Sequence, residues 1–387
     1  KPSQEGLLLA NLYNMIAKKM GVTTVSAAKV EVAYLDKCAT DLVAAKGKAI
    51  VVSATNNVAI QDLVNAINGL LGSVGNTLDF STPYMVGQGN DSEMSRFITD
   101  LNGGVYDAVI FMSNPIYDHP ESAKIAQGIK KAKLSISLSD RVNETAALCQ
   151  YTAATSHYLE NWGDAEVKKG HYSLIQPTIT NIYDTRQAEA SLLTWAGMSG
   201  DYQAYLKKNW NSSILNGSKS WVQSLHDGVF ERTVSSENTV SSIAYTGDVS
   251  AAAAMVGGVK SNGIELHVFE NVTIGAGSQA NNPWLQETPD PISKVTWENT
   301  AAISQKTAND LSIAQGDIVK LTLQGIEVEL PVMVQPGQAH DTISVALGYG
   351  RTAAGKAGNV GVNVFPVIST VNGNLSYWKT GVEVIKT

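Results

Sequence analysis

The sequence predicts an α/β protein in three parts: a sheet-and-helix domain over residues 1–150, a mixed α/β domain over 151–290 and a β-barrel over 291–387. In the first part, strands that alternate with helices predict a parallel sheet with helices on its faces. In the second, long helices alternate with loops rich in Asn, Ser and Gly, which indicates a mixed domain. In the third, apolar residues recur at every second position, which predicts strands.

The first part contains two clear strand-and-helix units. The β-rich run 48–55 precedes a helical period over 58–71, which stops at Gly72. An apolar-faced helix over 92–101 precedes a strand over 106–112. Each unit has the length of one step of a parallel α/β sheet.

A third unit follows, with a helix over 122–131 and a strand over 134–138. Right-handed crossovers through short helices usually place sequential strands side by side. We therefore expect 50–53 and 108–111 to be neighbours in one sheet.

The second part holds helices over 185–196 and 201–210. Asp184 is a candidate N-cap of the first of them, because its side chain can accept hydrogen bonds from free backbone N–H groups. The polar stretch around Gln176-Pro177 reads as a solvated loop.

The third part shows the clearest hairpin of the chain. Apolar residues occupy alternate positions over 319–323 and 326–330, and Gly325 lies between the two runs. Glycine at that place favours a tight turn. With a short helix over 306–311 before it, this pattern predicts a closed or nearly closed barrel.

Composition excludes several classes of protein. The chain has 387 residues, of which 44% are hydrophobic and 16% charged, against about 25% charged in an average globular protein. With 28 Lys+Arg and 35 Asp+Glu the net charge is −7, and no basic stripe is present. Nucleic-acid binding is therefore not expected. The most apolar run, 249–259, is about half the length of a membrane span, so no direct membrane span is expected.

The cysteines limit the metal chemistry. Cys38 and Cys149 are the two cysteines of the chain and lie far apart, so they do not supply the clustered thiolates of an iron–sulfur cluster or a structural zinc site. Any cluster would have to lie on another polypeptide or on a segment outside this sequence. We expect two separate buried thiols, with a single disulfide as the alternative.

Three glycine motifs imitate phosphate loops. The run 350–357 matches a Walker A loop except that Ala357 replaces the Ser or Thr that would bind magnesium. The runs 275–280 and 348–353 fit G-x-G-x-x-[GA], but neither opens a helix inside a βαβ unit. We interpret all three as loop glycines and expect no dinucleotide cofactor on the first part.

No catalytic residue is predicted from spacing. The six histidines never form a tight metal-ligand pair, and no G-x-S-x-G turn is present. His157 lies beside Tyr158, Glu160 and Trp162, where it could relay protons. A structural, hydrogen-bonded histidine is the simpler interpretation of the same cluster.

Particular strings extend the analysis. In the second part these are Ser156-His-Tyr-Leu-Glu-Asn-Trp-Gly-Asp-Ala165, Gly170-His-Tyr-Ser-Leu-Ile-Gln-Pro177 and Asp184-Thr-Arg-Gln187. They resemble the middle region of molybdopterin oxidoreductases of the dimethyl-sulfoxide-reductase superfamily. The runs 282–291, 294–299, 311–317, 336–338, 348–351 and 361–363 are similar to the pterin-facing barrel of the same enzymes.

Within that superfamily the chain most resembles the large iron–sulfur and molybdopterin-like subunit of bacterial alternative complex III. The resemblance implies a Rossmann-like parallel sheet in the first part and a molybdopterin-dinucleotide-binding-like barrel of double-psi type in the third. It also implies multihaem cytochrome c and quinol-binding membrane subunits as partners, on the periplasmic side of the inner membrane.

The resemblance covers a central and C-terminal fragment, since the superfamily's cysteine-rich cluster domain and its molybdenum ligand have no counterpart here. It implies six residues for contact with a pterin, which are relics if the molybdenum cofactor has been lost. They are His157 and Glu160 in the second part, and Asn299, His340, Arg351 and Asn363 in the third.

Two functions follow as hypotheses. The first is a non-catalytic, cofactor-free module that scaffolds a respiratory complex; we then expect the chain to contain no molybdenum, iron or pterin. The second is a fragment of an active molybdenum-pterin oxidoreductase. The aromatic strings 158–162 and 284–285 are either an interaction surface or packing between the second and third parts.

Overall fold

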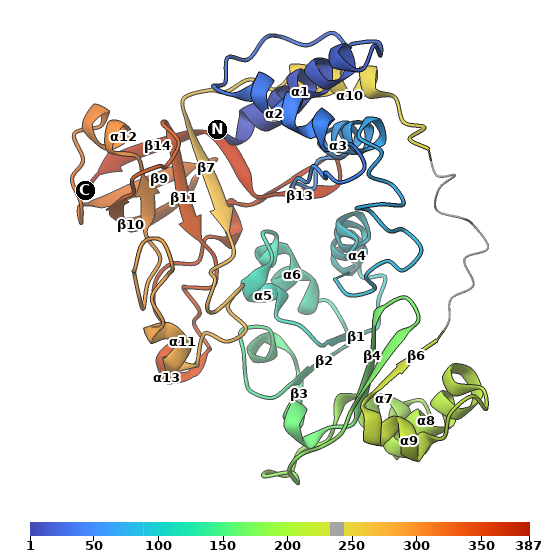
Figure 1. Cartoon of the computed structure of the whole chain (residues 1–387). Coiled ribbons are helices and arrows are strands. Elements are labelled where there is room, and N and C mark those ends of the chain that lie inside the picture. Colours follow the sequence, from blue (N-terminus) through green and yellow to red (C-terminus); the bar gives the residue numbers. More distant parts are fainter. Residues whose placement is uncertain (88, 233–243) are drawn as a thin grey trace.

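The computed structural model describes residues 1–87, 89–232 and 244–387 (Figure 1). Four packed regions make up the chain: a helical layer, a parallel sheet with its helices, an antiparallel sheet with its helices, and a closed barrel. In Figure 1 the helical layer lies at the top, the barrel at the left and the antiparallel sheet at the bottom, around the parallel sheet.

The helical layer combines three helices from residues 5–70 with a fourth helix from residues 249–257, far away in the sequence. It consists of α1 (Glu5–Lys19), α2 (Leu35–Ala44), α3 (Val58–Leu70) and α10 (Val249–Gly257), whose apolar faces share one core. Gly6 permits the close approach of α1 to α10, because a Cβ there would lie 2.6 Å from Cγ1 of Val256. Residues 1–70 therefore pack with a helix of the second part rather than with the parallel sheet.

The parallel sheet has three strands in the order β1 (Ala108–Phe111), β2 (Leu134–Ser139) and β3 (Tyr151–Ala154). The helices α4 (Asp91–Gly103) and α6 (Ser122–Ile129) pack against it, with the short α5 (Pro115–Asp118) before α6. The strands predicted over 106–112 and 134–138 are confirmed, as is their parallel pairing.

The prediction that 50–53 forms a neighbouring strand is wrong. This segment is extended and its side chains alternate between α3 and solvent, but the neighbour of β1 is β2. Its backbone is satisfied by side chains: the amide of Val51 donates to Oδ1 of Asn68 at 2.9 Å, and Nδ2 of Asn68 donates back to the Val51 carbonyl at 2.8 Å. A side-chain amide thus replaces the strand partner.

The second part contains an antiparallel sheet of β4 (Gly163–Lys168), β5 (His171–Ile175) and β6 (Val229–Glu231). It packs on a core around Trp210, whose indole donates to Asp164 at 2.8 Å. The helices that cover it are α7 (Ala188–Trp195), α8 (Tyr202–Asn209), the π-helix η4 (Trp210–Leu215) and α9 (Trp221–Asp227).

One predicted cap in this part is wrong. Helix α7 begins at Ala188 with Gln187 as its N-cap residue, so Asp184 lies in the loop before it. Asp201 does cap α8, because its carboxylate accepts from the amide of Ala204 at 2.9 Å.

The barrel is closed by six strands in the order β10-β8-β11-β7-β14-β9. They are β7 (Ile264–Phe269), β8 (Ala301–Ile303), β9 (Ile318–Leu323), β10 (Ile326–Val334), β11 (Thr342–Ala346) and β14 (Trp378–Lys386). Strand β7 comes from residues before 291, so the barrel reaches beyond the predicted range 291–387. Around it lie α11 (Pro283–Glu287), α12 (Gln305–Asp310), α13 (Gly355–Gly358) and the hairpin β12 (Ser369–Val371) and β13 (Asn374–Ser376).

The predicted hairpin in the barrel is confirmed. Strands β9 and β10 pair antiparallel from Leu323 and Ile326 outward, and their inward side chains fill the barrel core. Gln324 and Gly325 form the turn with φ of 53° and 81°. Two successive residues with positive φ match the twist of the strands they connect.

Neither cysteine is paired within the described residues, and Cys38 is exposed while Cys149 is half-buried. The expectation of two buried thiols is therefore wrong for Cys38, which lies on the outer face of α2.

The helices in residues 1–87, 89–232 and 244–387 include none with both the length and the apolar character needed to cross a bilayer.

The role of Asn68 can be tested by the substitution Asn68→Ala. Because Asn68 is 2% exposed and carries both hydrogen bonds to Val51, its loss should lower the free energy of unfolding by about 1–3 kcal/mol. Amide exchange at Val51 should accelerate at the same time. The control Asn76→Ala removes an exposed amide that donates to the Gly72 carbonyl, and should cost about 0.5 kcal/mol or less. Unchanged exchange at Val51 in the Asn68 variant would contradict the assignment.

Candidate functional site

The candidate site lies where the parallel sheet meets the barrel. Asn114 follows β1 and Glu144 follows β2, so both lie beyond the carboxyl ends of neighbouring parallel strands. In open α/β sheets this is the edge at which ligands bind. The barrel contributes two loops to the junction, 271–282 after β7 and 347–363 after β11.

A buried ion pair forms the centre of the junction. Arg351 and Glu144 are each 8% exposed, and the guanidinium Nε and Nη2 donate to the carboxylate at 2.8–3.1 Å. Nη1 of Arg351 donates to the Gly277 carbonyl at 2.7 Å. This forked geometry matches a planar guanidinium to a planar carboxylate, so the pair links the segment after β2 to both barrel loops.

The Glu144 carboxylate has further donors. The amides of Thr352 and Ala353 donate to Oε1 at 2.8 and 2.9 Å, and Nδ2 of Asn114 donates to Oε2 at 2.8 Å. Burial alone would raise the pKa of Glu144, but the hydrogen bonds from Arg351, Asn114 and Ala353 outweigh it and hold that pKa well below its ordinary value. The Glu144 carboxylate is therefore ionised. The hydrogen bonds that it accepts all come from other groups of the protein.

Tyr117 closes the junction from the α5 side. The guanidinium of Arg351 lies over its ring, 4.6 Å from the centroid, and its hydroxyl donates to the Tyr349 carbonyl at 2.8 Å. The next residue, Asp118, keeps an exposed edge, yet desolvation raises the pKa of its carboxyl to about 6 against the lowering effect of Arg351. Asp118 thus changes charge close to neutral pH.

Three of the six residues implied by the resemblance meet here. Asn299 is 2% exposed, donates to the carbonyls of Ala346 and Val362, and accepts from the Val362 amide. Asn363 donates to the Tyr117 carbonyl and accepts from the Phe365 amide. Arg351 is the third, and each of the three is hydrogen-bonded to other groups of the protein.

The other three lie elsewhere. Nδ1 of His340 is hydrogen-bonded to the Ser304 hydroxyl at 3.1 Å, at the N-terminus of α12. His157 and Glu160 form a capping box on the short 3-10 helix η3 (Tyr158–Glu160). The Glu160 carboxylate accepts from the amides of His157 and Ile182. These contacts support the structural interpretation of His157 over a proton relay.

The glycine motifs serve close packing at the junction. Gly350 has φ of 70°, and a Cβ there would lie 1.9 Å from the Asn363 amide nitrogen. Gly277 has φ of 96°, and a Cβ there would lie 2.8 Å from the Tyr117 ring. Only glycine lets these loops come together.

Two of the residues implied for a pterin, Asn299 and Arg351, have no polar group free for one in this arrangement. Both N–H groups and the oxygen of the Asn299 amide are engaged, and each guanidinium nitrogen of Arg351 donates to a protein oxygen. Among the described residues, no three His, Cys, Asp or Glu side chains meet in a way that could hold a metal ion. The arrangement supplies a rigid polar contact between domains.

Sequence reasoning missed Glu144 and Asn114, which contribute the carboxylate of the junction and one of its hydrogen-bond donors. A signal for them was present, because each follows a predicted strand by a few residues, and parallel strands bring such positions to one edge. Their partner Arg351 is 207 residues away from Glu144, a separation that no local pattern can bridge.

Comparison with known proteins agrees with the fold. No family model matches the sequence. The menaquinone reductase molybdopterin-binding-like subunit of Nitratidesulfovibrio vulgaris (strain Hildenborough) is 24% identical over 297 residues, 72% of this chain and 41% of that protein. Acetylene hydratase from Pelobacter acetylenicus is 12% identical with a TM-score of 0.64, covering 100% of this chain and 70% of that one.

The chain therefore has a molybdopterin oxidoreductase-like fold, with a parallel sheet and a closed six-stranded barrel. It spans less than half the length of the curated relative that it matches. The double-psi type of the barrel and the Rossmann-like character of the first part stay predictions.

The ion pair can be tested by Glu144→Gln. This variant leaves Arg351 buried without a counter-charge, which should cost about 3–5 kcal/mol of unfolding free energy at pH 7. Because the folded pKa of Glu144 lies below its ordinary value of 4.5, the stabilisation is present above that value and is lost as the pH falls below it. The difference from wild type should therefore shrink between pH 7 and pH 3, as measured by denaturant unfolding.

Two controls accompany this measurement. Asp41→Asn breaks the exposed pair with Lys37 and should cost about 0.5 kcal/mol or less. In the double variant Glu144→Gln, Arg351→Met the loss should be smaller than the sum of the two single losses. A pH-independent difference, or strict additivity, would show that the pair is not coupled as described.

Proposed function

We propose that this chain is a cofactor-free molybdopterin oxidoreductase-like module that acts as a scaffold in a respiratory quinol-oxidising complex. The proposal rests on one observation: three residues that the resemblance implies for contact with a pterin form hydrogen bonds within the protein instead. The polar groups of Asn299, Arg351 and Asn363 contact the protein itself, and Glu144 neutralises the buried guanidinium. The position at which this fold would recognise a charged cofactor is thus a contact between domains.

The comparison supports the respiratory setting. The relative from Nitratidesulfovibrio vulgaris is named a subunit of menaquinone reductase and molybdopterin-binding-like. By analogy we assign this chain to a membrane respiratory complex of alternative complex III type on the periplasmic side of the inner membrane. Multihaem cytochrome c and quinol-binding membrane subunits are the proposed partners.

Exposed aromatic side chains supply surfaces for such partners. Trp284 is 79% exposed at the start of α11, and Tyr158 is 67% exposed at the start of η3. The alternative that both pack between the second and third parts is wrong for these two side chains, although Trp162 of the same string packs on the Trp210 core. Large exposed aromatics are typical of protein interfaces.

Cofactor content separates the scaffold from the alternative, a fragment of an active molybdenum-pterin enzyme. We expect the protein, purified as the full chain, to contain no stoichiometric molybdenum, iron or pterin. The measurement is elemental analysis combined with fluorescence of the oxidised, extracted pterin. Near-stoichiometric pterin would overturn the scaffold proposal and would require Asn299 and Arg351 to release their present partners.

The interface is tested by Trp284→Glu. Because Trp284 is largely exposed, the free energy of unfolding should change by about 0.5 kcal/mol or less. Co-purification of haem-containing partner subunits should fall. Val222→Glu, at a 74% exposed position on α9, is the matched control and should assemble normally. An unfolded Trp284 variant would indicate a core role, and normal assembly would exclude this surface as an interface.

A further inference from the structure

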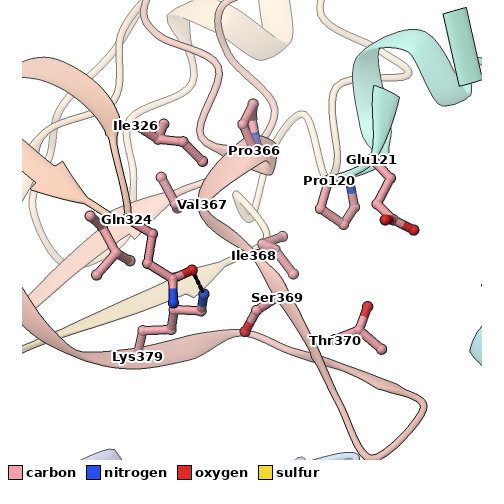
Figure 2. Close-up of a pocket in the computed structure, with 11 residues that line it drawn as sticks. Pro120, Glu121, Gln324, Ile326, Pro366, Val367, Ile368, Ser369, Thr370 and Lys379 are labelled. Atoms are coloured by element: carbon pink, nitrogen blue, oxygen red, sulfur yellow. Dashed lines mark hydrogen bonds between the residues drawn. The ribbon is translucent and has the colours of Figure 1, made fainter. Parts of the chain in front are cut away.

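A cavity of about 230 Å³ lies at a different contact between the sheet domain and the barrel (Figure 2). Pro120 and Glu121, which precede α6, line one wall together with Thr370. Gln324 of the β9–β10 turn and Lys379 of β14 line the other. The cavity shares none of its lining residues with the Glu144–Arg351 junction.

Lys379 brings a positive charge into this cavity that no carboxylate neutralises. Its Nζ donates to Oε1 of Gln324 at 2.5 Å, and no Asp or Glu of the described residues lies within ion-pair distance of it. Desolvation lowers the pKa of the Lys379 ammonium, with no opposing effect from an acidic neighbour. A partly desolvated cation without a counter-ion favours the binding of an anion.

Glu121 does not cancel this charge, although it lines the same cavity. Its carboxylate forms an ion pair with Lys124 on α6. In Figure 2 its carboxylate lies across the cavity from the side chains of Gln324 and Lys379. The cavity is therefore positive on the barrel side.

A serine of the cavity wall, Ser369, carries a buried hydroxyl that makes no hydrogen bond within the described part of the chain. Neighbouring protein atoms cover this oxygen, so a ligand in the cavity does not contact it. The rest of the lining is largely apolar and includes Leu323, Ile326, Pro366, Val367 and Ile368.

We propose that this cavity binds a small aliphatic monocarboxylate, with its carboxylate on Lys379 and its chain against the apolar lining. One ammonium group matches a single negative charge, whereas a phosphate dianion would need further cations. The volume corresponds to roughly seven or eight water molecules, which accommodates a chain of butyrate size. The proposal does not depend on the scaffold function.

The wild-type protein provides the first test. Saturation-transfer NMR on the full chain should show saturable binding of butyrate. Butyramide, which has the same shape without the charge, should bind about tenfold more weakly or worse, which corresponds to about 1.4 kcal/mol. Inorganic phosphate should not displace butyrate. Equal binding of butyrate and butyramide would overturn the proposal, and displacement by phosphate would assign the cavity to a general anion site instead.

Substitution locates the site. Lys379→Met should weaken butyrate binding about tenfold or more, while Lys379→Arg, which keeps the charge, should retain most of it. Lys306→Met is the matched control, because it removes an exposed lysine of α12 that is paired with Asp310, and should bind butyrate like wild type. Unchanged affinity in a folded Lys379→Met variant would place the carboxylate elsewhere and refute the proposal.

Discussion

The buried pair of Glu144 and Arg351 is the constraint on which the junction of the domains depends. Moving two charges out of water costs several kcal/mol for each ion unless hydrogen bonds replace the lost hydration. Three separate segments supply these hydrogen bonds. The side-chain amide of Asn114 after β1 and the backbone amides of Thr352 and Ala353 donate to Glu144. The Gly277 carbonyl in the other barrel loop accepts from Arg351. The loops must approach closely to do so, which explains why glycine occupies 277 and 350.

The same constraint accounts for the inward orientation of these side chains. At the carboxyl edge of a parallel sheet, free backbone donors and a nearby arginine form a natural site for an anion. Here Glu144 provides that anion from within the chain. Because its pKa is lowered, it stays charged at neutral pH, and the arginine requires no external partner. In this structure the edge is a contact between two domains.

Sequence patterns predicted the elements that are stabilised locally. Strands β1 and β2, helix α3 and the β9–β10 hairpin lie where periodicity and turn residues place them. The segment 48–55 has the same alternation as a strand, but its partner is the side chain of Asn68, which no strand pattern reveals. The packing of α10 on α3 and the entry of β7 into the barrel depend on contacts between distant residues. For the site, the resemblance implied Arg351 and Asn363. Their hydrogen-bond partners, Glu144 and the Tyr117 carbonyl, were found only in the structure.

Arg351 and Lys379 show how one physical rule distinguishes two interdomain contacts. Both cations lie where the sheet domain meets the barrel, and both are partly or fully withdrawn from water. Arg351 has a carboxylate with matching geometry, whereas Lys379 has one neutral amide oxygen as its partner. A charge that the chain itself neutralises stabilises the fold without a ligand. A charge left without a counter-ion beside a cavity is stabilised when an anion binds, so we infer that a small anion binds at Lys379 rather than at the Glu144–Arg351 junction.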